Sequence, residues 1–132
     1  MSWYYRQKLN KNVLNVCPTG WHLPTDAEWT TLTTYLGGQS VAGGKLKETG
    51  TTNLQSPNTG ATNESGYTAL PGGYRYNDGN FYVMGFNSFW WSSTESSSSD
   101  AFDRSVFYLY GIVLKSGMLK HYGYSVRCLR DL

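Results

Sequence analysis

The chain has 132 residues, a formal net charge of +2 and only 15% charged residues. This length suits one domain with a real core but not two, so we expect a single domain over residues 1–132. The low charge density argues against a nucleic-acid-binding surface, and no apolar run is long enough to span a membrane. The residues after Met1 lack the basic start and apolar stretch of a signal peptide.

Aromatic and small polar residues dominate the composition, with 5 Trp, 11 Tyr, 5 Phe and 15 Gly. Such a composition favours strands, turns and loops over helices. Tyr, Ser, Gly and Asn are also the residues that antibody binding loops use, because Tyr gives contact area at low entropic cost. An aromatic-rich β core explains any single one of these residues equally well.

One well-marked helix is expected early in the chain, after one or two short extended segments at residues 3–16. Thr25 followed three residues later by Glu28 predicts a capping box at its start. Gly37 and Gly38 predict its end, because glycine adopts the left-handed conformation found there. Helical spacing predicts one buried stripe, formed by Ala27, Trp29, Leu32, Tyr35 and Leu36.

Strands and loops are expected to make up most of the remaining chain. Residues 40–49 predict at best a short helix, and residues 49–65 predict a surface loop because they carry almost no apolar side chains. An Asp-Gly pair within 77–80 predicts a tight hairpin turn, and the serines at 96–99 predict a loop. The expected strands are 67–70, 74–76, 81–83, 89–93, 101–109, 112–119 and 124–130.

Catalytic and metal-binding motifs are missing from the sequence. There is no nucleophile elbow, phosphate loop or paired-cysteine metal motif. His22 lies beside apolar residues and is expected to be structural, and Asn63 and Glu64 offer too few oxygen ligands for calcium. We therefore expect a protein that is not an enzyme and that has no metal site and no cofactor.

Cys17 and Cys128 leave two alternatives open. A disulfide between them would close a loop of more than a hundred residues, which stabilises the fold by about 4–5 kcal/mol in the chain-entropy model. Two buried free thiols in a reducing compartment are the other alternative. The disulfide is the favoured prediction.

Four segments together resemble a known family: CPTGWHLPTDAEW at 17–29, LPGGYR at 70–75, FWWSST at 89–94 and YSVRCLRD at 124–131. In this order, over about residues 13–131, they resemble the Fibrobacter succinogenes major paralogous domain. That family is similar to the formylglycine-generating-enzyme group within the C-type-lectin-like fold. The resemblance implies an α+β fold with one main early helix, a loop-rich antiparallel sheet and paired N- and C-terminal strands, which is consistent with joining Cys17 to Cys128.

Two chemistries of these related groups are not implied for this chain. The cysteines that formylglycine-generating enzymes use near the C-terminus have no match here. The Glu-Pro-Asn and Trp-Asn-Asp triplets of calcium-dependent lectins are absent as well. The resemblance therefore implies neither oxidase activity nor lectin-type calcium binding.

Domains of this type also resemble the variable proteins of diversity-generating retroelements, in which mutagenic copying rewrites adenine-containing codons of a C-terminal segment. The resemblance implies a variable ligand-binding segment at about residues 83–121. Its expected ligand-binding residues are Phe86, Ser88, Asp103, Ser105, Phe107, Leu109, Tyr110, Ile112, Leu114, Ser116, Met118, Leu119 and His121. The expected scaffold residues are Trp21, Trp29, Trp90, Trp91 and Arg127.

The strand expected at residues 102–110 supports this division. Alternate residues of a strand share a face, so one face carries Asp103, Ser105, Phe107 and Leu109. An acid, a hydroxyl, a ring and an aliphatic side chain do not form an ordinary core face. We therefore expect Asp103 and Ser105 on the surface, together with Ser116 and His121. Two alternatives, a sheet core or an exposed binding patch, stay open for Phe107, Leu109, Ile112 and Leu114.

The sequence thus predicts a non-catalytic binding module that presents a diversified C-terminal surface to a protein or glycan ligand on another cell. We expect it outside the cell, on a bacterial surface or a phage particle. The alternative is a secreted or cell-surface domain of fixed specificity, such as a polysaccharide adhesin. A nearby reverse transcriptase gene with an adenine-rich template repeat favours the first function, and an invariant C-terminal third in related strains favours the second.

Overall fold

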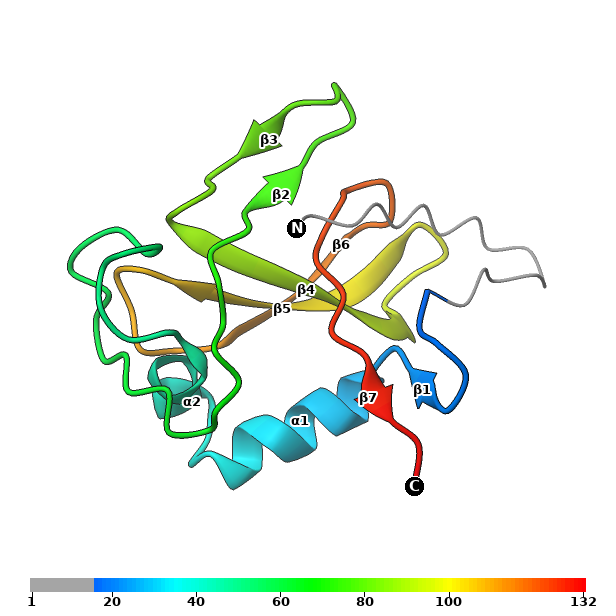
Figure 1. Ribbon diagram of the computed structural model, residues 1–132. Helices are drawn as coiled ribbons and strands as arrows, with labels where there is room; N and C mark the ends of the chain where they lie inside the picture. Colours follow the sequence, from blue (N-terminus) through cyan, green and yellow to red (C-terminus); the bar gives the residue numbers. More distant parts are fainter. Residues whose placement is uncertain (1–15) are drawn as a thin grey trace.

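The computed structural model describes residues 16–132, so nearly all of the extended segments expected at residues 3–16 lie outside the described part. The helices are α1 (Asp26–Tyr35) and α2 (Gln39–Leu46). The strands are β1 (Trp21–His22), β2 (Tyr74–Arg75), β3 (Phe81–Tyr82), β4 (Asn87–Glu95), β5 (Asp100–Phe107), β6 (Leu114–Leu119) and β7 (Leu129–Arg130). They pair antiparallel as β1–β7, β2–β3 and β4–β5–β6 (Figure 1). The α+β class and the pairing of the terminal strands are therefore confirmed.

Helix α1 begins where the sequence predicts. The Thr25 hydroxyl accepts a hydrogen bond from the Glu28 backbone N–H, and the Glu28 carboxylate accepts one from the Thr25 backbone N–H at 2.8 Å. This is the expected capping box. The predicted buried stripe is right for Trp29 and Leu36 and wrong for Tyr35, which is 85% exposed.

Helical geometry explains this error. Six residues at about 100° per residue place Tyr35 roughly 240° around the helix from Trp29, so the two side chains leave α1 about 120° apart and Tyr35 lies off the buried stripe. Ala27 is also exposed, for the same reason. The buried polar residue Thr33 takes the place of Tyr35, and its hydroxyl donates to the Trp29 carbonyl at 3.1 Å.

Strand β5 is the central strand of the main sheet, and hydrophobic side chains lie on both of its faces. The cluster on the helix side contains Trp29, Leu36, Ala42, Leu46, Ala69, Trp90, Val106 and Val113. The cluster on the other face contains Trp91, Ala101 and Tyr124, with Tyr74, Phe89, Met118 and Tyr122 packed against it. On the helix side, the buried Arg104 also forms an ion pair with Asp26 of α1 at 2.8 Å.

Three expectations for the connecting segments need correction. Residues 67–70 are not a strand, because only Ala69 forms a bridge, with Lys47. Of the strand expected at 124–130, only Leu129–Arg130 pairs with β1, whereas Ser125 bridges to Trp90 of β4. Residues 49–65 form a loop as predicted, but it is packed against the protein, since Leu54 and Asn58 are buried.

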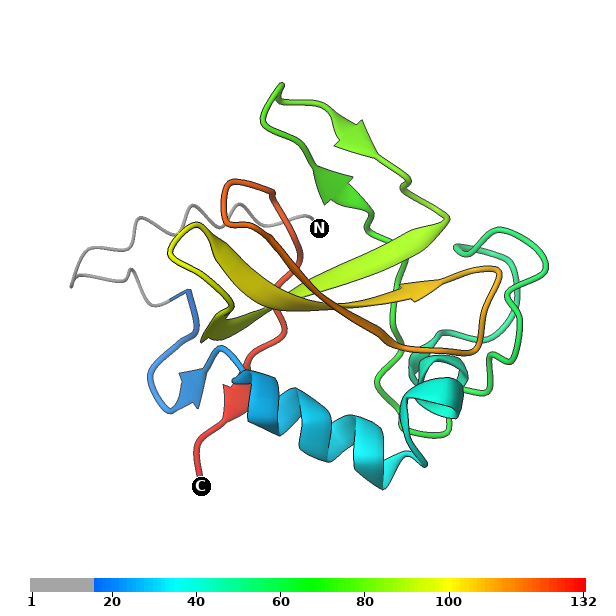
Figure 2. The same ribbon diagram turned by 180° about the vertical axis from the view of Figure 1, so that it is seen from behind.

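The β2–β3 hairpin projects from the main sheet on the side away from the helices (Figure 1). Strand β6 is an edge strand of this sheet, and seen from behind it crosses in front of β5 (Figure 2). It pairs with β5 alone among the named strands. No helix in residues 16–132 has the length and apolar character needed to cross a lipid bilayer.

The two ends of the described chain are joined beside the start of α1. Cys17 and Cys128 form the favoured disulfide, with their Cα atoms 5.8 Å apart. His22 of β1 lies between two carboxylates, with Nδ1 2.6 Å from Asp131 and Nε2 2.9 Å from Glu28. The hydrogen bond to Asp131, and to a smaller extent the one to Glu28, raises the pKa of His22 above its ordinary value. His22 thus joins β1 to the start of α1 and to the C-terminal segment, and its assignment as a purely structural residue stays a prediction.

Replacing Cys128 by serine tests the covalent link. Under oxidising conditions we expect Cys128→Ser to lower the melting temperature, because the unfolded chain regains loop entropy worth about 4–5 kcal/mol. In excess reductant the wild type has lost the same link, so the two proteins should melt together. Thermal melts followed by circular dichroism make the comparison, with Cys17→Ser as the matched variant. An equal gap in both conditions would contradict the assignment of this stabilisation to the disulfide.

Candidate ligand-binding surface

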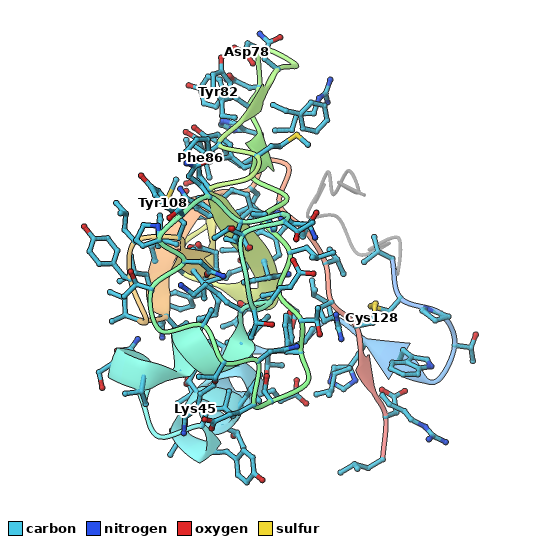
Figure 3. All side chains as sticks on the ribbon, turned by 60° about the vertical axis from the view of Figure 1, so that its left-hand side comes forward. Lys45, Asp78, Tyr82, Phe86, Tyr108 and Cys128 are labelled. Atoms are coloured by element: carbon cyan, nitrogen blue, oxygen red, sulfur yellow. A yellow bond between two sulfur atoms is a disulfide. The ribbon has the colours of Figure 1, made fainter. Side chains whose placement is uncertain are left out.

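Exposed apolar side chains concentrate on the β2–β3 hairpin, its exit and the loop between β5 and β6. We call this set the aromatic surface. It consists of Tyr76, Phe81, Tyr82, Val83, Met84, Phe86, Leu109 and Tyr110, whose exposed fractions run from 36% for Tyr76 to 60% for Met84. Figure 3 shows Asp78, Tyr82 and Phe86 at the end of the molecule opposite Lys45. The hairpin part of the surface therefore lies away from the helices, whereas the β5–β6 loop packs against α2.

The turn of the hairpin is fixed by Asp78. Its carboxylate accepts hydrogen bonds from the Asn80 backbone N–H at 2.8 Å and from the Tyr82 hydroxyl at 2.6 Å. The Tyr82 hydroxyl lowers the pKa of Asp78, and Asp78 in return raises the pKa of Tyr82. Gly79 adopts a left-handed conformation (φ 89°) that suits glycine. The Asp-Gly signal in the sequence is thus confirmed.

Tyr74 anchors the base of the hairpin to the main sheet. Its ring lies 5.6 Å from that of Tyr82, 5.5 Å from Phe89 and 5.7 Å from Tyr122, measured between ring centroids. Aromatic pairs at such separations stabilise by about 0.5–1.5 kcal/mol beyond their buried area. The exposed rings of the hairpin therefore rest on a packed aromatic base.

The hairpin exit also contacts the end of β5. The rings of Phe86 and Tyr108 meet edge to face with centroids 5.3 Å apart, and the Tyr108 N–H donates to the Phe86 carbonyl at 3.0 Å. Figure 3 places these two labelled residues side by side. Leu109 and Tyr110, both exposed, follow Tyr108 directly in the chain.

The structure separates the expected ligand-binding residues into three groups. The exposed group is Phe86, Leu109, Tyr110, Leu114, Ser116, Leu119 and His121. The partly buried group is Phe107, Ile112 and Met118. The buried group is Ser88, Asp103 and Ser105. Surface positions for Ser116 and His121 are confirmed, whereas surface positions for Asp103 and Ser105 are wrong.

The central position of β5 explains the buried group. Asp103 lies between Trp91 of β4 and Ser116 of β6, whose hydroxyl donates to its carboxylate at 2.7 Å. Ser105 lies in the same way between Phe89 and Leu114. Each of these short polar side chains has a large aromatic neighbour on β4, Trp91 or Phe89, which helps to cover it. Ser88 is held inside by its own hydrogen bond, which it donates to the Leu70 carbonyl at 2.7 Å.

The expected scaffold residues divide as well. Trp29, Trp90 and Trp91 are buried, whereas Trp21 and Arg127 are exposed. The Arg127 guanidinium lies 4.5 Å from the centre of the Tyr67 ring, a cation–π contact at the edge of the helix-side cluster.

The expected ligand-binding residues did not include the hairpin part of the aromatic surface, namely Tyr76, Phe81 and Tyr82, or Val83 and Met84, which lie within the bounds expected for the variable segment. A signal for it was present: the Asp-Gly turn joins two aromatic strands that are too short to form a sheet with two covered faces. Some of the aromatic side chains on these strands therefore had to face solvent.

The aromatic surface offers contact area rather than reactive groups. Its polar groups are phenol hydroxyls and the hydrogen-bonded Asp78 carboxylate. Within residues 16–132, no three His, Cys, Asp or Glu side chains are grouped so as to hold a metal ion. The arrangement suits binding through ring stacking and hydrogen bonds.

The described residues thus define an α+β domain with joined ends and a projecting aromatic hairpin. The sequence model of the Fibrobacter succinogenes major domain matches residues 2–130. The chain therefore belongs to this family. No curated protein and no solved structure is significantly similar to it.

The buried carboxyl of Asp103 makes a pH-dependent stability measurable. Burial raises its pKa to about 6, above its value of about 3.9 in an unfolded chain. Between these values the folded state holds more protons than the unfolded state, so this group lowers stability as pH rises from 4 to 7. We expect Asp103→Asn, which still accepts from Ser116, to remove that decline and to gain about 1–3 kcal/mol at pH 7.

Urea unfolding at a series of pH values measures both effects. Asp100→Asn, which removes a carboxylate from the start of the same strand, is the control for a general change of charge. If the free energy of unfolding changed with pH in the same way in wild type and Asp103→Asn, the raised pKa of Asp103 would be contradicted.

Proposed function

We propose that this protein is a non-catalytic ligand-binding module of C-type-lectin-like fold that recognises a protein or glycan on another cell through the aromatic surface. The observation that carries the proposal is the exposure of large apolar side chains on one projecting hairpin and the loop beside it. Contiguous exposed apolar patches mark interaction sites more often than chance. Phenol hydroxyls beside the rings add hydrogen-bonding groups without a fixed charge.

Preorganisation supports binding at this place. The Tyr74 contacts hold the base of the hairpin, and the Tyr108 hydrogen bond holds its exit beside the β5–β6 loop. A surface fixed before the encounter loses less conformational entropy on association, so more of its contact energy appears as affinity. The disulfide also fits an oxidising location outside the cell.

Diversification is proposed for the exposed members of the expected variable segment. These are Phe86, Leu109, Tyr110, Leu114, Ser116, Leu119 and His121. Surface substitutions away from caps and networks usually change stability by about 0.5 kcal/mol or less, a condition that Ser116 does not meet because its hydroxyl donates to the buried Asp103 carboxylate. A frame that tolerates such changes suits the variable protein of a diversity-generating retroelement.

A fixed-specificity adhesion domain is the second candidate, and the buried group favours it. Ser88, Asp103 and Ser105 lie inside the expected variable segment but are buried, and two of them form side-chain hydrogen bonds. Large replacements there would disturb the core. A segment constrained in this way suits a surface that is kept constant between strains.

Binding screens on glycan arrays and on panels of cell-surface proteins test the proposed function. For any ligand found, we expect Leu109→Ser combined with Tyr110→Ser to weaken binding at least about tenfold, because each loses a large contact side chain. Tyr35→Ser is the matched control, since Tyr35 is an exposed tyrosine on α1, outside the aromatic surface. Unchanged affinity in the double variant, or equal loss in the control, would contradict the proposal.

A further inference from the structure

Lys47, the residue that follows α2, is fully buried, with 0% of its surface exposed. Its ammonium donates three hydrogen bonds to backbone carbonyls, to Thr59 at 2.8 Å, Phe107 at 2.9 Å and Tyr110 at 2.8 Å. These acceptors belong to two segments distant in sequence, the loop at 49–65 and the end of β5 with its following loop. One side chain therefore joins both segments.

The ammonium of Lys47 is satisfied by carbonyl oxygens alone. It has three N–H donors, and each has an acceptor. Among residues 16–132, the ion pairs formed by carboxylates involve other cations. Burial lowers the pKa of Lys47 to about 8, so the group still carries its charge at neutral pH. A buried charge needs such partners, because an unpaired one is costly.

Helix α2 packs its backbone against the same two segments. A Cβ atom on Gly43 would collide with the Ile112 carbonyl, and one on Gly44 would collide with the Gly60 carbonyl. The Gly44 N–H donates to the Gly111 carbonyl at 3.0 Å, and its own carbonyl accepts from Thr62 at 2.9 Å. The glycine pair brings α2 close enough for the Lys47 ammonium to reach both loops.

We propose that Lys47 is a positioning residue whose ammonium acts as an internal cation, joining the 49–65 loop to the β5–β6 loop and thereby fixing Leu109 and Tyr110. The joining of the two loops stands on the contacts alone. Its value for ligand recognition rests on the proposed function. Removal of the side chain would leave three converging carbonyls and a space shaped for a small alkylammonium ion.

Chemical rescue tests the cation directly. In Lys47→Ala we expect the amides of Thr59 and Tyr110 to exchange with deuterium at least about tenfold faster than in wild type, because local opening becomes easier. Addition of n-propylammonium, which replaces the missing atoms and charge, should slow them again. Neutral n-propanol should not, and Lys47→Met should not respond to the ammonium ion, because the methionine side chain fills the space.

Lys120→Ala is the matched control, because this buried lysine binds the Ser98 carbonyl and Glu95, at the connection between β4 and β5. Equal slowing by n-propylammonium in Lys120→Ala, equal slowing by n-propanol, or no slowing in Lys47→Ala would overturn the proposal. Should Lys47→Ala fail to fold, refolding that depends on n-propylammonium supports the proposal, and failure to refold with it contradicts the proposal. These results need no ligand, so they stand apart from the outcome of the binding screens.

Discussion

The central position of β5 in the main sheet determines where exposed apolar side chains can lie. β4 and β6 flank it, the helices cover one face, and the Trp91–Tyr124 cluster covers the other. Neither face of its middle is open to a ligand. The exposed aromatic and aliphatic residues therefore lie on structures that leave the sheet, namely the β2–β3 hairpin and the β5–β6 loop, and on the edge strand β6.

The rest of the architecture keeps these projecting parts in place. The disulfide, the β1–β7 pair and the carboxylates around His22 close the far end of the domain. Tyr74 and Tyr108 hold the hairpin against the sheet. The contacts that hold the fold thus lie largely apart from the exposed residues of the hairpin and the β5–β6 loop.

Two local signals in the sequence predicted local structure correctly. The capping box of Thr25 and Glu28 and the Asp78–Gly79 turn depend on neighbours a few residues away, and both are confirmed. Alternation along β5 correctly paired Asp103 with Ser105 on one face. It did not reveal what covers that face, because Trp91 and Phe89 arrive from another strand. The three carbonyls around Lys47 were equally invisible, since they meet only in the folded chain.

Saturation mutagenesis with a folding readout, such as protease resistance on a display platform, tests the central claim most directly. We expect Phe86, Leu109, Tyr110 and His121 to accept large and small side chains alike. Ser88, Asp103 and Ser105 should reject large ones, because their neighbours leave no space. Equal tolerance at the two sets of positions would contradict the division between a fixed frame and a replaceable surface.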